Sequence, residues 1–161
     1  KSSKLWKLYR RKEAVEVAEV NKIVFHTAEK ELYYNGEVIV KYSIEYPEII
    51  SSPYEIGSQI FNHYNRKLAL QLKQFAEGEF YNQAKETYEY NQSNGYPIMV
   101  YELVRECDIT YNNQKLVSLY CDEYTFAGGA HGNTLRKSQT WDLSYDIAPY
   151  SSGIMTFLLK K

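Results

Sequence analysis

Hydrophobic and polar residues follow two different periods along this chain, and these periods separate strand-like from helix-like segments. Stretches rich in β-branched and aromatic residues, which favour strands, lie on both sides of one long central segment. In that central segment apolar residues recur every three or four positions, as they do on one face of an α-helix. The stripe consists of Ile60, Phe61, Tyr64, Leu68, Leu72, Phe75 and Ala76, and it resumes at Phe80, Tyr81, Ala84 and Tyr88.

The predicted helix has signals at both ends. Ser52 can cap the first turn, Pro53 suits the first helical position, and Glu55 would complete a capping box. Gly78 is a point at which the helix could be interrupted, because glycine is a poor helix former. The polar run from Asn91 to Gly95 ends the pattern.

A β-hairpin is predicted before the helix. Asn35-Gly36 separates the strand-like runs 31–34 and 37–46, and Asn-Gly is a preferred two-residue turn because both positions need a positive φ. Pro47 either ends the second strand or places it at a sheet edge. Residues 14–27 also have a strand-like composition, although their alternation is imperfect.

An antiparallel meander is predicted after the helix. Strand-like runs at 98–111 and 115–126 flank a turn near residue 114, and a third run at 133–143 follows the loop Ala127–Gly132. The order of elements therefore predicts an α+β fold, an antiparallel β-sheet meander with one long amphipathic helix packed on one face. Residues 1–12 are basic and are predicted to be a tail, whereas 13–161 form a single domain.

The two cysteines lie on facing strands of the predicted meander. A turn centred near residue 114 places Cys107 opposite Cys121, so a disulfide is geometrically feasible. Two reduced cysteines that act as small apolar residues are the alternative. Neither a CxxC motif nor paired Cys/His spacing is present, so the cysteines do not form a metal signature.

Charge and composition exclude several classes of function. The 161 residues include 19 Lys and Arg and 20 Asp and Glu, a formal net charge of −1, which argues against nucleic-acid binding through a general electrostatic footprint. No apolar run approaches the roughly 20 residues of a membrane helix, and any signal or anchor would precede Lys1. The 17 tyrosines are unusual; their apolar rings with polar tips suit recognition surfaces.

The densest candidate for chemistry is the glycine-rich loop. Gly128, Gly129 and Gly132 surround His131, and a histidine held there could be a metal ligand, a general base or a hydrogen-bond donor. A histidine that bonds the turn between two strands is the more common role. The loop does not resemble a phosphate-binding loop, because no Gly-Lys-Ser/Thr sequence follows it.

No catalytic set can be assembled from the sequence. Carboxylates are numerous, but a glycosidase requires two that converge across a cleft. His26 and His63 are isolated, neither cysteine has a nucleophile context, and a Gly-x-Ser-x-Gly motif is absent. We therefore expect no catalytic residue, no metal and no cofactor, which favours a binding module.

The segment Tyr124–Asn133, which contains Gly-Gly-Ala-His-Gly, and the run Trp141-Asp142-Leu143 resemble a bacterial extracytoplasmic domain family. That family is shared by lysozyme-sensing anti-sigma factors and the N-terminal regions of some peptidoglycan deacetylases. The helix from Ile56 onward, the segment Pro97–Tyr111 and the segment Tyr145–Gly153 are similar to the family as well. In the family several dozen residues separate Trp-Asp-Leu from the C-terminal signature, whereas here Ser144 joins Tyr145 directly. Either this member has lost that subdomain, or a segment of the natural protein is absent from the sequence between 144 and 145.

The resemblance implies a non-catalytic cell-envelope recognition domain that binds a protein such as lysozyme or a peptidoglycan fragment. It implies an extracytoplasmic location, secreted or anchored to the membrane only through an upstream segment, and it makes the Cys107–Cys121 disulfide more expected. An enzyme that acts on cell-wall polysaccharide, or a deacetylase accessory region, is the alternative. The residues expected to make contacts are Gly128, Gly129, His131, Tyr145, Pro149 and Tyr150.

Two further expectations concern charge and the C-terminal segment. Because c-type lysozymes are strongly basic, an acidic patch of Asp108, Asp122 and Glu123 would supply the long-range attraction. Pro149 and Tyr150 could instead simply close the edge of the sheet.

Overall fold

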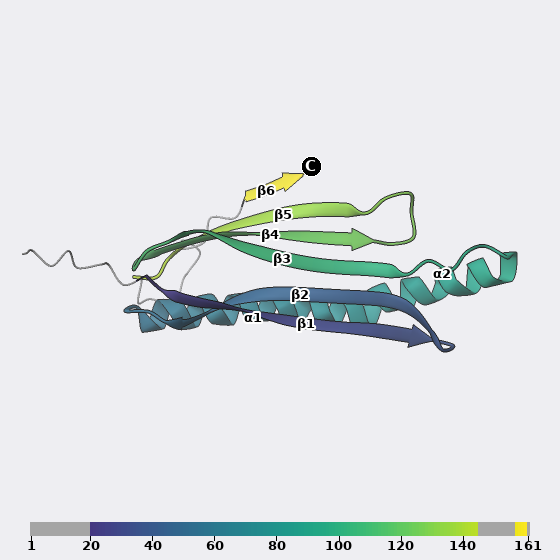
Figure 1. Ribbon diagram of the computed structural model, residues 1–161, viewed down its shortest axis with the longest axis horizontal. Helices are drawn as coiled ribbons and strands as arrows, with labels where there is room; N and C mark the ends of the chain where they lie inside the picture. The colour runs from purple at the N-terminus through teal and green to yellow at the C-terminus, as the bar shows by residue number, and fades with distance from the viewer. Residues whose placement is uncertain (1–19, 145–156, 161) are drawn as a thin grey trace, which may run out of the picture.

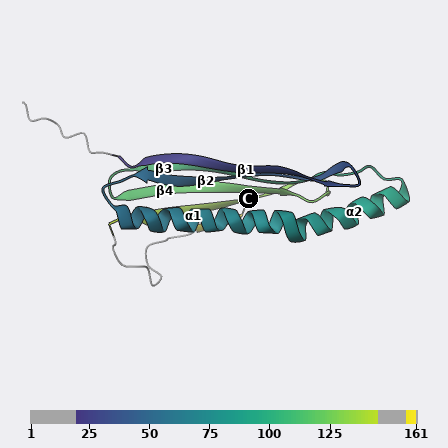
Figure 2. The same ribbon diagram turned by 90° about the horizontal axis from the view of Figure 1, so that it is seen from below.

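The computed structural model describes residues 20–144 and 157–160, which form one sheet and one long helix that runs along one face of the sheet (Figures 1 and 2). Six strands are hydrogen-bonded in sequence order. They are β1 (Lys22–Tyr34), β2 (Glu37–Ser51), β3 (Tyr101–Asn112), β4 (Leu116–Phe126), β5 (Asn133–Asp142) and β6 (Phe157–Lys160). The predicted tail, 1–12, and the segment 145–156 lie outside the described residues.

The α+β class is confirmed, but the prediction of a purely antiparallel sheet is wrong. Strands β2 and β3 pair in parallel, from Val40↔Tyr101 to Ile44↔Arg105, whereas the other neighbouring strands pair antiparallel. The reason is the helix between them. It carries the chain back along the whole of β2, so that β3 starts at the same end of the sheet as β2 and runs in the same direction.

The first hairpin follows its local sequence. Asn35 and Gly36 have φ values of 50° and 85°, as the predicted Asn-Gly turn requires. Strand β2 continues through Pro47, which pairs with Phe25 of β1. Pro47 lies beyond the last β2–β3 pair, at Ile44, so its missing N–H leaves no gap in that ladder.

The helix is nearly continuous over three segments, α1 (Glu55–Phe75), the π-helical turn η1 (Ala76–Phe80) and α2 (Tyr81–Asn94). Gly78 lies in η1, so the helix changes its winding at this glycine rather than stopping there. Gly95 ends the helix in the left-handed conformation, with φ 69°. The predicted capping box does not form, because the Ser52 hydroxyl accepts a hydrogen bond from the Tyr54 N–H (3.1 Å) and the helix begins at Glu55 without a side-chain cap.

Two clusters of buried side chains fill the space between helix and sheet. One packs Phe80 and Ala84 of the helix against Val40 and Leu103 of the sheet. The second centres on Trp141, whose ring meets the rings of Phe61 and Tyr64 edge-on, at centroid distances of 5.3 and 5.2 Å. Such aromatic contacts add to the stabilisation that comes from burial of apolar area.

Buried polar groups fix how the helix sits on the sheet. Trp141 Nε1 donates to Gln139 Oε1 at 2.8 Å, and Gln139 Nε2 lies 3.5 Å from Asn65 Oδ1 on α1.

Arg105 is also buried, and it donates to the Glu45 carbonyl at 3.0 Å and pairs with Glu123 at 3.5 Å. Burial lowers the pKa of Arg105, and the Glu123 carboxylate opposes that shift.

The β3–β4 hairpin has the predicted register. Cys107 pairs with Cys121 across the two strands, and the structure joins them in a disulfide. Both sulfurs lie in the core beneath α1, and Arg105 Nη2 is 3.3 Å from Cys121 Sγ. In the described part of the chain neither cysteine is free to act as a nucleophile.

The contact between Gly57 of α1 and the backbone of Leu143, just after β5, predicts that alanine substitutions at two helical glycines have different effects on stability. A Cβ at Gly57 would overlap the Leu143 carbonyl, whereas a Cβ at Gly78 would meet nothing within 4 Å. We expect Gly57→Ala to lower the free energy of unfolding by about 1–3 kcal/mol because it over-packs this contact. Gly78→Ala should raise that free energy by roughly 0.5–1 kcal/mol, since alanine is the better helix former. Urea unfolding followed by circular dichroism measures both, and equal values for the two variants would contradict the close contact.

Candidate functional site

The glycine-rich loop Ala127–Gly132 joins β4 to β5 and lies against the end of the helix. Gly128 has a φ of 76°, and a Cβ placed on it would lie 3.2 Å from Tyr101 Cε1 and 3.7 Å from Met99 Cβ. Thr87 of α2 hydrogen-bonds the Tyr101 hydroxyl at 2.8 Å, so α2, the start of β3 and the loop form one packed unit. This unit holds the loop in place.

The three glycines of the loop have different roles. Gly128 needs its left-handed backbone, and Gly132 lies so close to the Tyr124 ring that a Cβ would overlap it. A Cβ on Gly129 would meet only the His131 carbonyl, at 3.9 Å. Two of the glycines are therefore required by geometry, and Gly129 is not.

Gly128, Gly129 and His131 lie together on this loop, as their positions in the sequence require. His131 is exposed, and no side-chain hydrogen bond to it is found within residues 20–144. The histidine therefore does not bond the turn, which was its more common expected role. Tyr145, Pro149 and Tyr150 lie outside the described residues.

Exposed aromatic side chains, which the sequence pattern did not single out, lie at the same end of the molecule. Tyr90 and Tyr96 are 62% and 55% exposed, with their ring centroids 6.1 Å apart, and Met99 is 37% exposed. Figure 1 shows the end of α2 and the β4–β5 loop at one end of the sheet. We call Tyr90, Tyr96, Met99, Gly128, Gly129 and His131 the loop-end surface. Tyr90 could have been noticed, because it falls off the apolar stripe of the helix.

The expected acidic patch is not a single patch, and that prediction is wrong in part. Asp108 and Asp122 lie on the open face of the sheet, the face away from the helix, where Tyr120 donates to Asp108 at 2.6 Å and Arg136 Nε donates to Asp122 at 2.7 Å. Glu123 follows Asp122 in β4, so its side chain points to the helix side, where it pairs with Arg105 and Lys137.

The open face nevertheless carries many carboxylates. Strand alternation and register place on it Glu29, Glu31, Glu102, Glu106, Asp108 and Asp122, together with Lys41 and Arg136. Glu106 lies directly opposite Asp122, and like charges at such positions repel each other. Lys41 pairs with Glu31 and Arg136 with Asp122, so carboxylates still outnumber cationic groups among these side chains.

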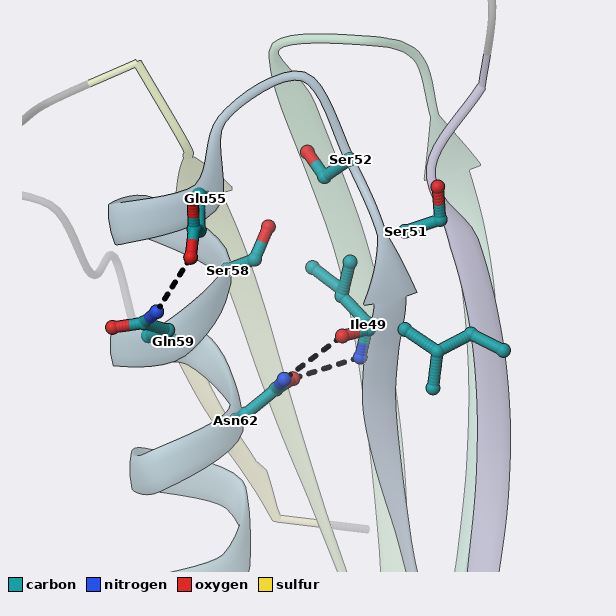
Figure 3. Close-up of a pocket in the computed structure, with 8 residues that line it drawn as sticks. Ile49, Ser51, Ser52, Glu55, Ser58, Gln59 and Asn62 are labelled. Atoms are coloured by element: carbon teal, nitrogen blue, oxygen red, sulfur yellow. Dashed lines mark hydrogen bonds between the residues drawn. The ribbon is translucent and has the colours of Figure 1, made fainter.

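A pocket of about 330 Å³ lies at the other end of the molecule, between the end of β2 and the first turns of α1 (Figure 3). We call it the β2–α1 pocket. Asn62 forms part of its wall by bonding both the N–H and the carbonyl of Ile49, at 2.7 and 2.9 Å. The lining residues are Ile49, Ile50, Ser51, Ser52, Glu55, Ser58, Gln59 and Asn62.

Tyr42 of β2 and Glu77 of η1 form a hydrogen-bonded pair in which both groups have a shifted pKa. Burial, together with the hydrogen bond that it donates to Glu77, raises the pKa of Tyr42 to about 12. Hydrogen bonds from Tyr42 and Lys30 lower the pKa of Glu77. In the described ranges no group of three His, Cys, Asp or Glu side chains could hold a metal ion, and no helix is long and apolar enough to cross a membrane.

Comparison with known proteins relates most of the chain to one family. The family model described as deacetylase PdaC matches residues 34–134, which include the helix and the glycine-rich loop. Peptidoglycan-N-acetylmuramic acid deacetylase PdaC of Bacillus subtilis is 32% identical over 91 residues, which are 56% of this chain and 19% of that protein. The chain therefore spans about a fifth of the length of this curated relative.

Two solved structures resemble the chain. A DUF3298 family member from Bacteroides fragilis has a TM-score of 0.62 at 12% identity, and the match covers 78% of this chain and 57% of that one. A DUF3298 family protein from Pseudomonas aeruginosa has a TM-score of 0.48 at 13% identity, with coverage of 78% and 53%. The Bacteroides structure shows that the fold is shared.

The different roles of the loop glycines can be tested by single substitutions. We expect Gly132→Ala to lower the free energy of unfolding by about 1–3 kcal/mol because it displaces Tyr124, and Gly128→Ala to lower it by about 1–2 kcal/mol because of its left-handed backbone. Gly129→Ala is the matched control and should change stability by less than about 0.5 kcal/mol. Urea unfolding measures all three. A large loss for Gly129→Ala alone would contradict the loop geometry.

Proposed function

The chain belongs to the deacetylase PdaC family, and from this we propose that it is a non-catalytic recognition domain of the bacterial cell envelope, with a lysozyme-like protein or a peptidoglycan fragment as its partner. The observation that carries the proposal is the loop-end surface, where exposed aromatic side chains lie at the same end of the molecule as a loop that belongs to the matched segment. Aromatic anchors dominate protein interfaces, and their flat rings can also stack on the faces of sugars.

Recognition rather than catalysis is supported by the chemistry of this surface. It presents two phenol rings, a thioether, an exposed imidazole and glycine backbone, with no carboxylate pair across a cleft among these residues. The deacetylase activity in the relative's name belongs to a protein of which this chain matches 19%. A match to so small a part of the relative is expected if this chain is a recognition module and a separate region of the relative carries the catalysis.

The two partner classes have different support. The name of the Bacillus subtilis relative supports a ligand that contains peptidoglycan. The open face supports a basic protein, because its carboxylates, which include Glu102 and Glu106, would steer a cationic partner toward the domain. An extracytoplasmic location fits both partners, and it fits the Cys107–Cys121 disulfide.

The proposal is tested by calorimetric titration of the domain with a c-type lysozyme and, in parallel, with soluble muropeptides. We expect one of them to bind with a Kd of roughly 1 µM or lower, about −8 kcal/mol. If the partner is lysozyme, the affinity should fall as salt rises, because the open face contributes by charge. Heat from neither partner would contradict the proposal.

Substitution of the two exposed tyrosines ties this binding to the loop-end surface. We expect Tyr90→Ala/Tyr96→Ala to weaken binding at least about tenfold, a loss of roughly 1.4 kcal/mol. Tyr111→Ala is the matched control, because Tyr111 is 51% exposed and lies at the far end of β3. Equal losses in the two variants would argue against this surface.

A further inference from the structure

The β2–α1 pocket is a candidate second binding site, at the opposite end of the sheet from the loop-end surface (Figures 1 and 3). Its volume of about 330 Å³ falls within the range of small-molecule sites. None of the residues on the loop-end surface lines it. Any ligand it binds would therefore be bound independently of that surface.

The walls of the pocket are held in place by the fold. The pairing of β2 with β3 ends at Ile44, so the backbone of β2 near Ile49 needs another hydrogen-bond partner on that side. Asn62 of α1 provides it with a donor and an acceptor at 2.9 and 2.7 Å. Because helix and strand are joined in this way, the pocket is formed before any ligand arrives, which lowers the entropic cost of binding.

The lining offers uncharged hydrogen-bonding groups around one carboxylate. Figure 3 shows the side chains of Ser52, Ser58 and Glu55 grouped around the turn from β2 into α1. Gln59 Nε2 donates to Glu55 Oε1 at 3.2 Å, which positions both groups. In the described part of the chain no side chain caps the first turn of α1, so no side-chain acceptor competes with a ligand for the first N–H groups of the helix.

These groups select against charged ligands. An anion would meet the Glu55 carboxylate, and within residues 20–144 and 157–160 no Lys, Arg or His lines the pocket to offset the repulsion. A cation would find Glu55 as its single charged ligand among the lining residues, and the positive end of the α1 dipole would offset part of that attraction. What remains is a neutral ligand with several groups that both donate and accept hydrogen bonds, and with apolar C–H surface for the exposed Ile50 side chain.

We propose that the β2–α1 pocket binds a neutral saccharide. Glu55 accepts hydrogen bonds from sugar hydroxyls, and a charged acceptor makes such bonds stronger than neutral ones. Gln59 and Ser51 provide further polar contacts, and the half-exposed Ile50 side chain lies beneath the C–H face of the ring. This inference goes beyond the loop-end recognition proposed above and does not depend on it.

The test is an NMR titration of the isotope-labelled chain with two probes, chitotetraose and cellotetraose. We expect at least one of them to shift the backbone amide signals of residues 49–62 with a Kd of about 1 mM or lower, which is roughly −4 kcal/mol. The proposal is overturned if neither probe shifts the signals of this segment at a concentration tenfold above that expected Kd.

A matched pair of variants separates a binding role from a structural one. Glu55→Gln/Gln59→Ala should weaken saccharide binding at least fivefold. Glu79→Gln/Gln83→Ala is the matched control. It removes an equivalent Gln–Glu hydrogen bond between residues four apart, also 3.2 Å long, from a helical site outside the pocket. This control should leave the affinity for the saccharide unchanged. Equal affinities in the two variants overturn the proposal, provided that thermal unfolding shows both to be folded.

The loop-end variant Tyr90→Ala/Tyr96→Ala separates this proposal from the previous one. It should bind the saccharide like the unmodified chain, because neither tyrosine lines the pocket. Loss of saccharide binding in this variant, with the pocket residues intact, would place the sugar at the loop-end surface and overturn the pocket assignment.

Discussion

The length of the helix relative to the strands is the constraint on which the rest of this structure depends. Forty residues from Glu55 to Asn94 span about 60 Å at the helical rise, whereas the fifteen residues of β2 span about 50 Å. The helix therefore returns the chain past the start of β2, which makes β3 parallel to β2. It also carries α2 beyond the end of the sheet (Figure 2), and Tyr90 and Tyr96 are exposed at this end of the molecule.

The opposite end of the same helix produces the second surface. Because α1 begins directly after β2, its first turns lie beside a strand that has already lost β3 as a neighbour, and the β2–α1 pocket forms between them. Gly57 allows the helix to touch the backbone at Leu143 nearby. One helix thus sets both ends of the molecule, an aromatic end that suits recognition of a partner and a polar end that suits a small neutral ligand.

Specific buried polar contacts then hold the helix in one position on the sheet. The hydrogen bond from Gln139 of β5 to Asn65 of α1, and the two hydrogen bonds between the Asn62 side chain of α1 and the Ile49 backbone, tie the helix to individual strand positions. Buried polar groups without partners are costly, so a shift of the helix by one turn would break these contacts and leave several groups unsatisfied. The apolar stripe alone would tolerate such a shift much better, since similar side chains recur along it.

The sequence by itself determined the local features of this protein: the Asn35-Gly36 turn, the amphipathic helix, the facing positions of Cys107 and Cys121, and the loop that carries His131. Each depends on residues close together in the chain, whose periodicity or turn chemistry can be recognised directly. The parallel pairing of β2 and β3, the exposure of Tyr90 and Tyr96 at the same end of the molecule as the loop, and the β2–α1 pocket were decided only by the tertiary structure. They depend on where a forty-residue helix starts and ends against the sheet, and that placement arises from packing between residues far apart in sequence.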